Sequence, residues 1–297
     1  VFSDAVGNLN IASTAMTATV DTVIPVISSV SSSTANGAYR AGSAIDIAVT
    51  FSKNVVVTTS AGSPTLLLET GSTDRLASYV GGTGTSVVTF RYVVQAGDVS
   101  NDLDAQSTSA LVLNGGFIKD LSGNDAVLTL ASPGASNSLG LAKAIVIDTV
   151  APIAPTNVVV TPVGGTVVAN TLLANNTNMT ATASIVAGQA TGGSAELLLG
   201  STTIATDTSI AAGDSSLSFN LNFSTSADLQ AAIAAGGQLT VRLLDAAGNA
   251  SLASLAVSLT VDYAKPTATL SSSRSAMKIG ETATISVQLS EPSSTFI

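Results

Sequence analysis

The chain has 297 residues, of which 19 are acidic and 10 basic, and it contains no histidine, cysteine or tryptophan. These zeros exclude a His-dependent catalytic triad, a His-ligated zinc site, a thiolate nucleophile and a disulfide framework. The formal net charge of −9 argues against nucleic acid as a partner, because phosphates need a basic surface. Mean hydropathy is +0.49, but apolar runs such as 144–147 are far shorter than the roughly 20 residues of a spanning helix, so no membrane insertion is predicted.

Strict alternation of apolar and polar residues predicts β-strands along the chain, at 45–51, 217–223, 239–243 and 255–261. One apolar and one polar face is typical of antiparallel strands packed on one side. Clusters rich in glycine and asparagine separate the runs, at 81–84, 114–116 and 192–193. We therefore predict an all-β fold of tandem immunoglobulin-like β-sandwich modules. Residues 226–236 are the exception, since a serine cap, Asp228 in the first turn and Ala-rich spacing up to Gly236 predict one short helix.

The chain also repeats itself. An aspartate that ends an apolar run is followed four residues later by proline in three places, at Asp21, Asp148 and Asp262. These junction aspartates lie 127 residues (21 to 148) and 114 residues (148 to 262) apart, which is the size of one immunoglobulin-like sandwich. The spacing predicts the C-terminal strands of a partial module at 1–21, whole modules at 22–148 and 149–262, and the N-terminal strands of a further partial module at 263–297.

A second motif, Asp-x-x-Gly-Asn, precedes each junction aspartate. Its three copies are Asp4–Asn8, Asp120–Asn124 and Asp245–Asn249. The distance from the motif's asparagine to the next junction aspartate is 13 residues (8 to 21), then 24 (124 to 148), then 13 (249 to 262). The glycine permits positive φ, so each copy predicts a tight loop that presents a carboxylate and an amide oxygen.

These motifs resemble the tandem bacterial immunoglobulin-like repeats of giant surface adhesins, including biofilm-associated and type I-secreted ones. In the first module the resemblance also rests on Phe90-Arg-Tyr-Val-Val-Gln-Ala-Gly-Asp98, on Asp102-Leu-Asp104 and on Leu113-Asn-Gly-Gly116. It covers essentially the whole chain. It implies an extracellular location at the bacterial cell surface and a stalk of modules, commonly stiffened by Ca²⁺ between them.

Calcium is the cofactor that these residues predict, because Ca²⁺ takes six to eight oxygen ligands and the aspartates gather at recurring places. The loop 98–104 adds three carboxylates that would repel one another without a cation, although it lacks the glutamate of an EF-hand. The alternative is that the junctions simply end strands and that the loops are ordinary Asx turns. The candidate metal ligands are Asp4, Asn8, Asp21, Asp98, Asp102, Asp104, Asp120, Asn124, Asp148, Asp245, Asn249 and Asp262.

Catalysis is not predicted. The chain has neither a Ser-x-x-Lys nor a Gly-x-Ser-x-Gly motif, and its glutamates are scattered over different modules, so we expect no enzyme activity and no small-molecule substrate. Three functions remain in competition: a stalk segment of a giant adhesin, a fibre or surface-layer subunit whose partial modules complement each other, and an accessory region of a secreted hydrolase. The expected partners are neighbouring modules of the same chain or of adjacent subunits.

Overall fold

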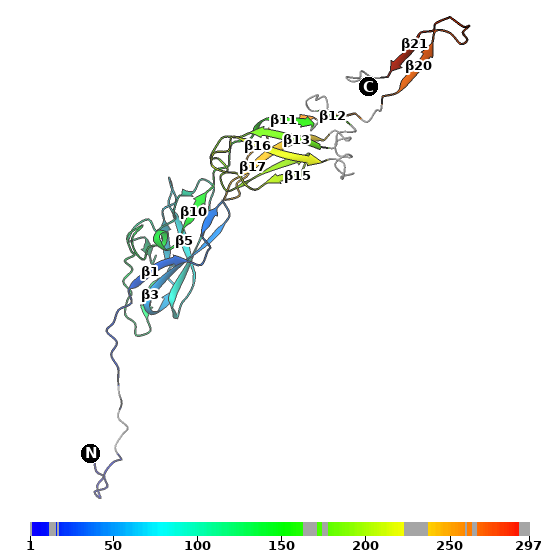
Figure 1. Cartoon of the computed structure of the whole chain (residues 1–297). Helices are drawn as coiled ribbons and strands as arrows, with labels where there is room; N and C mark the ends of the chain where they lie inside the picture. The colour runs from blue at the N-terminus through cyan, green and yellow to red at the C-terminus, as the bar shows by residue number, and fades with distance from the viewer. Residues whose placement is uncertain are drawn as a thin grey trace. The chain divides into compact units, whose positions relative to one another are not determined.

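The computed structural model describes residues 2–11, 16, 18–162, 171–173, 178–222, 237–258, 260–262 and 266–290 (Figure 1). The chain divides into two compact units. Unit 1 comprises Val1–Gly37 and Ala41–Ile147, and unit 2 comprises Ala38–Arg40 and Asp148–Ile297. The predicted all-β fold is confirmed, since strands dominate and the described residues contain one short helix. The finer division into four modular segments stays a prediction.

The strands of unit 1 form a large antiparallel sheet. Its order is β1 (Ile27–Ser32), β3 (Ala44–Thr58), β6 (Thr85–Val93), β5 (Arg75–Gly81), β4 (Thr65–Leu68) and β8 (Leu111–Val112), and β9 (Phe117–Asp120) also pairs with β3. A second sheet pairs β10 (Ile145–Asp148) with β7 (Val99–Ser100), and the short strand β2 spans Gly37–Tyr39. The helix α1 (Leu139–Ala142) is capped by the Ser138 hydroxyl, which accepts from the Leu141 N–H.

The core of unit 1 follows from the alternation in its sequence. Every second residue of β3 points inward, so that Ile45, Ile47 and Val49 are fully buried. Phe90 of β6 and Ile145 of β10 are buried as well. Burying such side chains contributes roughly 1.5–3 kcal/mol each, which makes this alternation the main source of stability.

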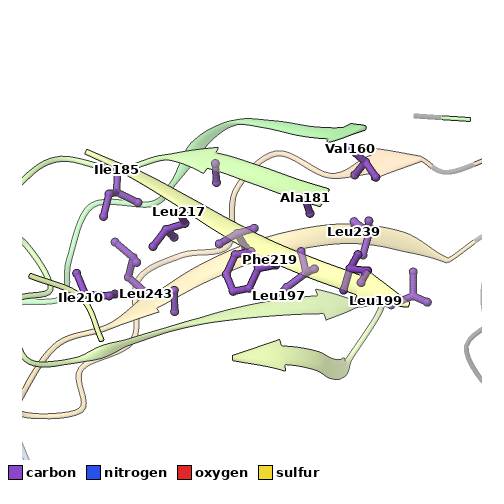
Figure 2. Close-up of a cluster of buried hydrophobic side chains, with 14 of the residues drawn as sticks. Val160, Ala181, Ile185, Leu197, Leu199, Ile210, Leu217, Phe219, Leu239 and Leu243 are labelled. Atoms are coloured by element: carbon purple, nitrogen blue, oxygen red, sulfur yellow. The ribbon is translucent and has the colours of Figure 1, made fainter. Parts of the chain in front are cut away.

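Unit 2 has two facing sheets. One has the order β11 (Thr156–Pro162), β13 (Asn178–Ser184) and β16 (Ser216–Asn222), and the other has the order β15 (Thr202–Asp207), β14 (Ser194–Leu199), β17 (Gln238–Leu244) and β18 (Val257–Ser258). Figure 2 shows Leu197, Phe219 and Leu243 among the side chains that point toward one another between the strands. Two smaller pairs complete the unit: β12 (Thr171–Leu173) runs parallel to β19 (Thr260–Asp262), and β20 (Ala268–Ser272) runs antiparallel to β21 (Ile285–Leu289).

Three of the four predicted runs match described strands, and the fourth matches in part. Runs 45–51 and 239–243 lie inside β3 and β17, and run 217–223 coincides with β16 up to Asn222. Run 255–261 is shorter than predicted, because the described strands there are β18 and β19, while Leu255 is 91% exposed. The predicted helix at 226–236 lies outside the described residues. No helix in the described part of the chain has the length and apolar character needed to span a bilayer.

Serine hydroxyls explain why the last run begins late. The Ser251 and Ser254 hydroxyls accept the N–H groups of Leu243 and Val241, each at 2.9 Å. The N–H groups of the same serines donate back to the carbonyls of Leu243 and Val241, each at 2.8 Å. Side-chain oxygens thus complete the pairing with β17 where a regular strand would use backbone carbonyls, which local hydrogen bonding by serine permits.

Candidate functional site

The three Asp-x-x-Gly-Asn copies adopt one turn geometry. In the copy that follows β9, the Asp120 N–H donates to the Asn124 carbonyl at 2.9 Å, and the Gly123 N–H donates to the Asp120 carbonyl at 3.1 Å. The copies beginning at Asp4 and Asp245 make the same two bonds, at 3.0–3.1 Å. The glycine of each copy has a φ of +88°, +93° or +85° in chain order, a conformation that a side chain would strain.

The aspartate of each turn is satisfied within the turn. Asp120 Oδ1 accepts the N–H groups of Ser122 and Asn124 at 2.9 Å, and its Oδ2 accepts the Asn124 side-chain amide at 2.9 Å. The hydrogen bond from the Asn124 amide is the main reason why the pKa of Asp120 lies below its usual range. Asp4 with Asn8, and Asp245 with Asn249, make the corresponding bonds. This geometry supports the Asx-turn interpretation of the motif.

The asparagine of the turn also binds a junction aspartate. Asn124 Nδ2 donates to the carbonyl of Asp21 at 3.1 Å, and Asn249 Nδ2 donates to the carbonyl of Asp148 at 2.9 Å. Each of these two turns therefore fastens the junction about one module upstream in sequence. We call each of these pairs a joint: joint 1 is Asp21 with 120–124, and joint 2 is Asp148 with 245–249.

The sequence contains a signal for this pairing. The separations from asparagine back to the upstream junction are 103 and 101 residues, and are thus nearly constant. The separations of Asn124 and Asn249 to the next junction, by contrast, are 24 and 13. A constant spacing indicates a contact inside one structural unit, whereas the downstream spacing changes with the loop that intervenes.

Joint 1 contains a residue that the sequence did not single out. Lys53 Nζ lies 2.6 Å from Asp21 Oδ2 and 2.9 Å from Asp120 Oδ2, and it donates to the Val23 carbonyl at 2.9 Å. The Ser122 hydroxyl donates to the same Asp21 oxygen at 3.1 Å. The hydrogen bond with Lys53 is the main cause that lowers the pKa of Asp21, and the two carboxylates raise the pKa of Lys53.

The residues of joint 1 do not fit Ca²⁺, because the Lys53 ammonium lies between the carboxylates that were predicted to hold the ion. At joint 2, Asp148 Oδ1 accepts the Val150 N–H at 2.9 Å, and N–H groups of Asn249 face the Asp245 carboxylate. The side chain of Asp262 lies outside the described residues. Over the described residues, no three or more His, Cys, Asp or Glu side chains gather where they could hold a metal ion. Calcium binding by the other candidate residues stays a prediction.

The predicted carboxylate cluster at 98–104 is divided by the fold. The side chain of Asp98 is 1% exposed and accepts from Arg75 Nε at 2.8 Å, from the Tyr92 hydroxyl at 2.7 Å and from the Gln95 N–H at 2.9 Å. Burial alone would raise the pKa of Asp98, but the hydrogen bonds from Tyr92 and Arg75 outweigh it and lower the pKa. Burial and the neighbouring Asp98 raise the pKa of Tyr92 well above its usual range. Asp98 is therefore a structural anchor of unit 1.

The other two carboxylates of this loop face α1. Asp104 Oδ1 accepts the N–H groups of Ala105 and Leu139, and its Oδ2 accepts the Gly134 N–H at 2.9 Å. A Cβ atom at Gly140 would lie 2.9 Å from an oxygen of Asp104 and 3.2 Å from one of Asp102. Burial, and then the negative charge of Asp104, raise the pKa of Asp102. Asp102 and Asp104 thus lie near each other beside Gly140.

Acid is expected to weaken unit 1 through Asp21, Asp98 and Asp120. The pKa of each is lower in the folded chain than the value of roughly 3.9 for an ordinary aspartate. Their stabilisation is therefore fully present above that value, and it is lost as the pH falls through the folded-state values. The melting temperature of unit 1 should thus fall when the pH is lowered below about 4. In Asp120→Asn, the same change of pH should lower the melting temperature by less. Equal midpoints at about pH 6 and pH 2.5 would contradict this prediction.

No protein-family model matches this chain, and no curated protein matches its sequence. The functional inference therefore depends on the residues and on the geometry of the two joints. That geometry consists of neutral and charge-assisted hydrogen bonds that hold chain segments together.

Proposed function

We propose that this chain is a structural spacer, a stalk segment of an extracellular bacterial adhesin, with no catalytic role. The observation that carries this proposal is the repeated fastening of a junction carbonyl by a turn asparagine, in joint 1 and again in joint 2. A chain of modules transmits force and keeps its length only if its linkers are fixed. A contact that recurs at the linkers of successive units supports such a role.

The linker of unit 1 is held along its whole length. The Val127 N–H donates to the Pro25 carbonyl at 2.9 Å, and the Ser52 N–H donates to the Val26 carbonyl at 2.8 Å. Val26 and Val127 form a parallel β-bridge. Together with Asn124 and Lys53, these contacts turn residues 21–26 from a flexible connection into an edge of the unit, because each bond removes backbone freedom that a free linker would keep.

The linker of unit 2 is held in a related way with different residues. Asn249 binds the carbonyl of Asp148, and the Ile153 N–H donates to Gln189 Oε1 at 3.2 Å. Pro152 and Pro155 restrict the same stretch further, since proline fixes φ. Both linkers are therefore short and attached, which favours a spacer over a set of independently moving domains.

The composition suits an extracellular location. Only 10% of the residues are charged, and the polar residues of the strands are mostly serine, threonine and asparagine. Such a surface remains hydrated without ion pairs, which salt would screen within about 10 Å at 0.1 M ionic strength. We propose neighbouring modules, of the same chain or of adjacent subunits, as the partners of this segment.

Distance measurements between the units test the spacer function. The chain has no cysteine, so Leu76→Cys in unit 1 and Leu255→Cys in unit 2 would give two unique spin-label sites, both at exposed positions. Pulsed electron spin resonance should yield one narrow distance distribution. Asn249→Ala should broaden it, because the start of the linker is released, whereas Asn220→Ala on the exposed face of β16 should leave it unchanged.

A broad distance distribution in the doubly labelled chain without any further substitution would contradict the spacer function. Light scattering on the same samples separates the spacer from the fibre subunit. A constant mass over a hundredfold range of concentration is expected for a spacer. A mass that grows steadily with concentration would favour assembly between copies instead.

A further inference from the structure

We propose that Lys53 is a built-in cation of joint 1, which takes the place of the predicted divalent ion and makes this joint independent of Ca²⁺. The inference deepens the proposed spacer function, because it says what holds one of the two linkers. The fastening can nevertheless be tested by itself, since it is a property of unit 1 alone.

The charges of joint 1 require a cation. Asp21 and Asp120 are 99 positions apart in the sequence (21 to 120), yet one oxygen of each contacts the same ammonium group, at 2.6 and 2.9 Å. Two carboxylates this close would repel each other without a positive charge between them. The Asp120 side chain is only 1% exposed, so bulk salt screens this interaction less than it screens a surface ion pair.

The ammonium group is fully used. A lysine has three N–H donors, and Lys53 has three acceptors within 2.9 Å, namely Asp21 Oδ2, Asp120 Oδ2 and the Val23 carbonyl. Three acceptors match the three donors of an ammonium group, and they are half or fewer of the six to eight oxygens that Ca²⁺ takes. The site therefore matches a lysine better than a divalent ion.

Joint 2 serves as an internal comparison. Residues 149–262 contain a single basic residue, Arg242, and it is paired with Glu196 between β17 and β14. Asp148 and Asp245 are held at joint 2 by backbone N–H groups and by Asn249. The two joints thus share the asparagine bond. Joint 2 also has a basic side chain at its turn, since Arg40 Nη1 donates to the Gly248 carbonyl at 2.6 Å, but the ion pairs of a base with the junction aspartate and the turn aspartate are described at joint 1.

Hydrogen exchange of the full chain tests this proposal. The N–H groups to follow are those of Val23, Ser122 and Val127, which are hydrogen-bonded at or beside joint 1. In Lys53→Met, their exchange should become about tenfold faster, because local opening of the joint becomes easier. Exchange at Asn249 in joint 2 should not change. For the unmodified chain, EDTA and millimolar Ca²⁺ should give the same exchange rates at all of these positions.

Lys119→Met is the matched control, because Lys119 pairs with Asp125 on the surface of the same unit, and it should leave joint 1 protected. Asp21→Asn keeps the pair between Lys53 and Asp120, and should loosen the linker even if Lys53→Met unfolds the unit. Three results would overturn the proposal: faster exchange at joint 1 in EDTA, restored protection of Lys53→Met by Ca²⁺, or unchanged exchange in both variants. If the hydrogen-exchange results are as expected but the distance distribution is broad, the spacer function is contradicted and the role of Lys53 is not.

Discussion

Replacing Asp98 by alanine is expected to lower the free energy of unfolding of unit 1 by about 3 kcal/mol, because removing one partner of a buried charge pair leaves the other uncompensated. The side chain of Asp98 is buried and accepts from Arg75, Tyr92 and the Gln95 N–H. Its loss would leave the buried Tyr92 hydroxyl without its acceptor, and the Arg75 guanidinium, whose side chain is 26% exposed, without its ion-pair partner.

Urea denaturation of the full chain, followed by circular dichroism, measures this effect, and hydrogen exchange assigns each transition to a unit. Asp125→Ala is the matched control, since Asp125 also pairs with a base but its side chain is 75% exposed. An exposed pair is worth about 0–1 kcal/mol, so this control should remain close to the original stability. Equal losses for the two variants would show that the Asp98 network does not anchor unit 1.

Replacing Phe219 by alanine is expected to lower the free energy of unfolding of unit 2 by about 3–5 kcal/mol, through lost burial and the cavity that remains. Phe219 lies on β16 between the two sheets of unit 2, in one buried cluster with Leu197, Leu217 and Leu243 (Figure 2). The two sheets cannot move together to fill the space of the missing ring without disturbing the contacts of neighbouring side chains, because protein interiors are close-packed.

The same denaturation experiment measures this second effect. Leu255→Ala removes a large apolar side chain that is 91% exposed, and it should change stability by less than about 0.5 kcal/mol. The transition assigned to unit 1 should keep its midpoint in Phe219→Ala. A loss below about 1 kcal/mol in Phe219→Ala would mean that the two sheets are not held by this core.

Local patterns were sufficient to predict the strands β3, β16 and β17. The alternation of Ile45, Ile47 and Val49 fixes which face of β3 is buried, since side chains of a strand point to opposite faces in turn. The turns followed in the same way, because the glycine at the fourth position of Asp-x-x-Gly-Asn permits positive φ in all three copies. Both features depend on neighbours within a few residues, which is the range that a sequence pattern covers.

The candidate site was predicted only in part. The sequence marked Asp21, Asp120 and Asn124 as residues of interest, and the structure brings these three together. It did not mark Lys53, because a single lysine in β3 has no motif and its partners are 32 and 67 positions away. The hydrogen bonds within the turn match the Asx-turn alternative, and the metal-ligand role of these residues stays a prediction.

The loop at 98–104 shows the limit most clearly. Asp98, Asp102 and Asp104 are close in sequence and were predicted to share a cation, yet Asp98 turns toward Arg75 and Tyr92 while Asp104 binds N–H groups near α1. The sequence by itself determined the strands β3, β16 and β17, the buried face of β3 and the repeated turns of this protein. Only the tertiary structure decided which charges meet, because Coulomb energy depends on distance in space and the chain brings residues from separate strands to within 3 Å of each other.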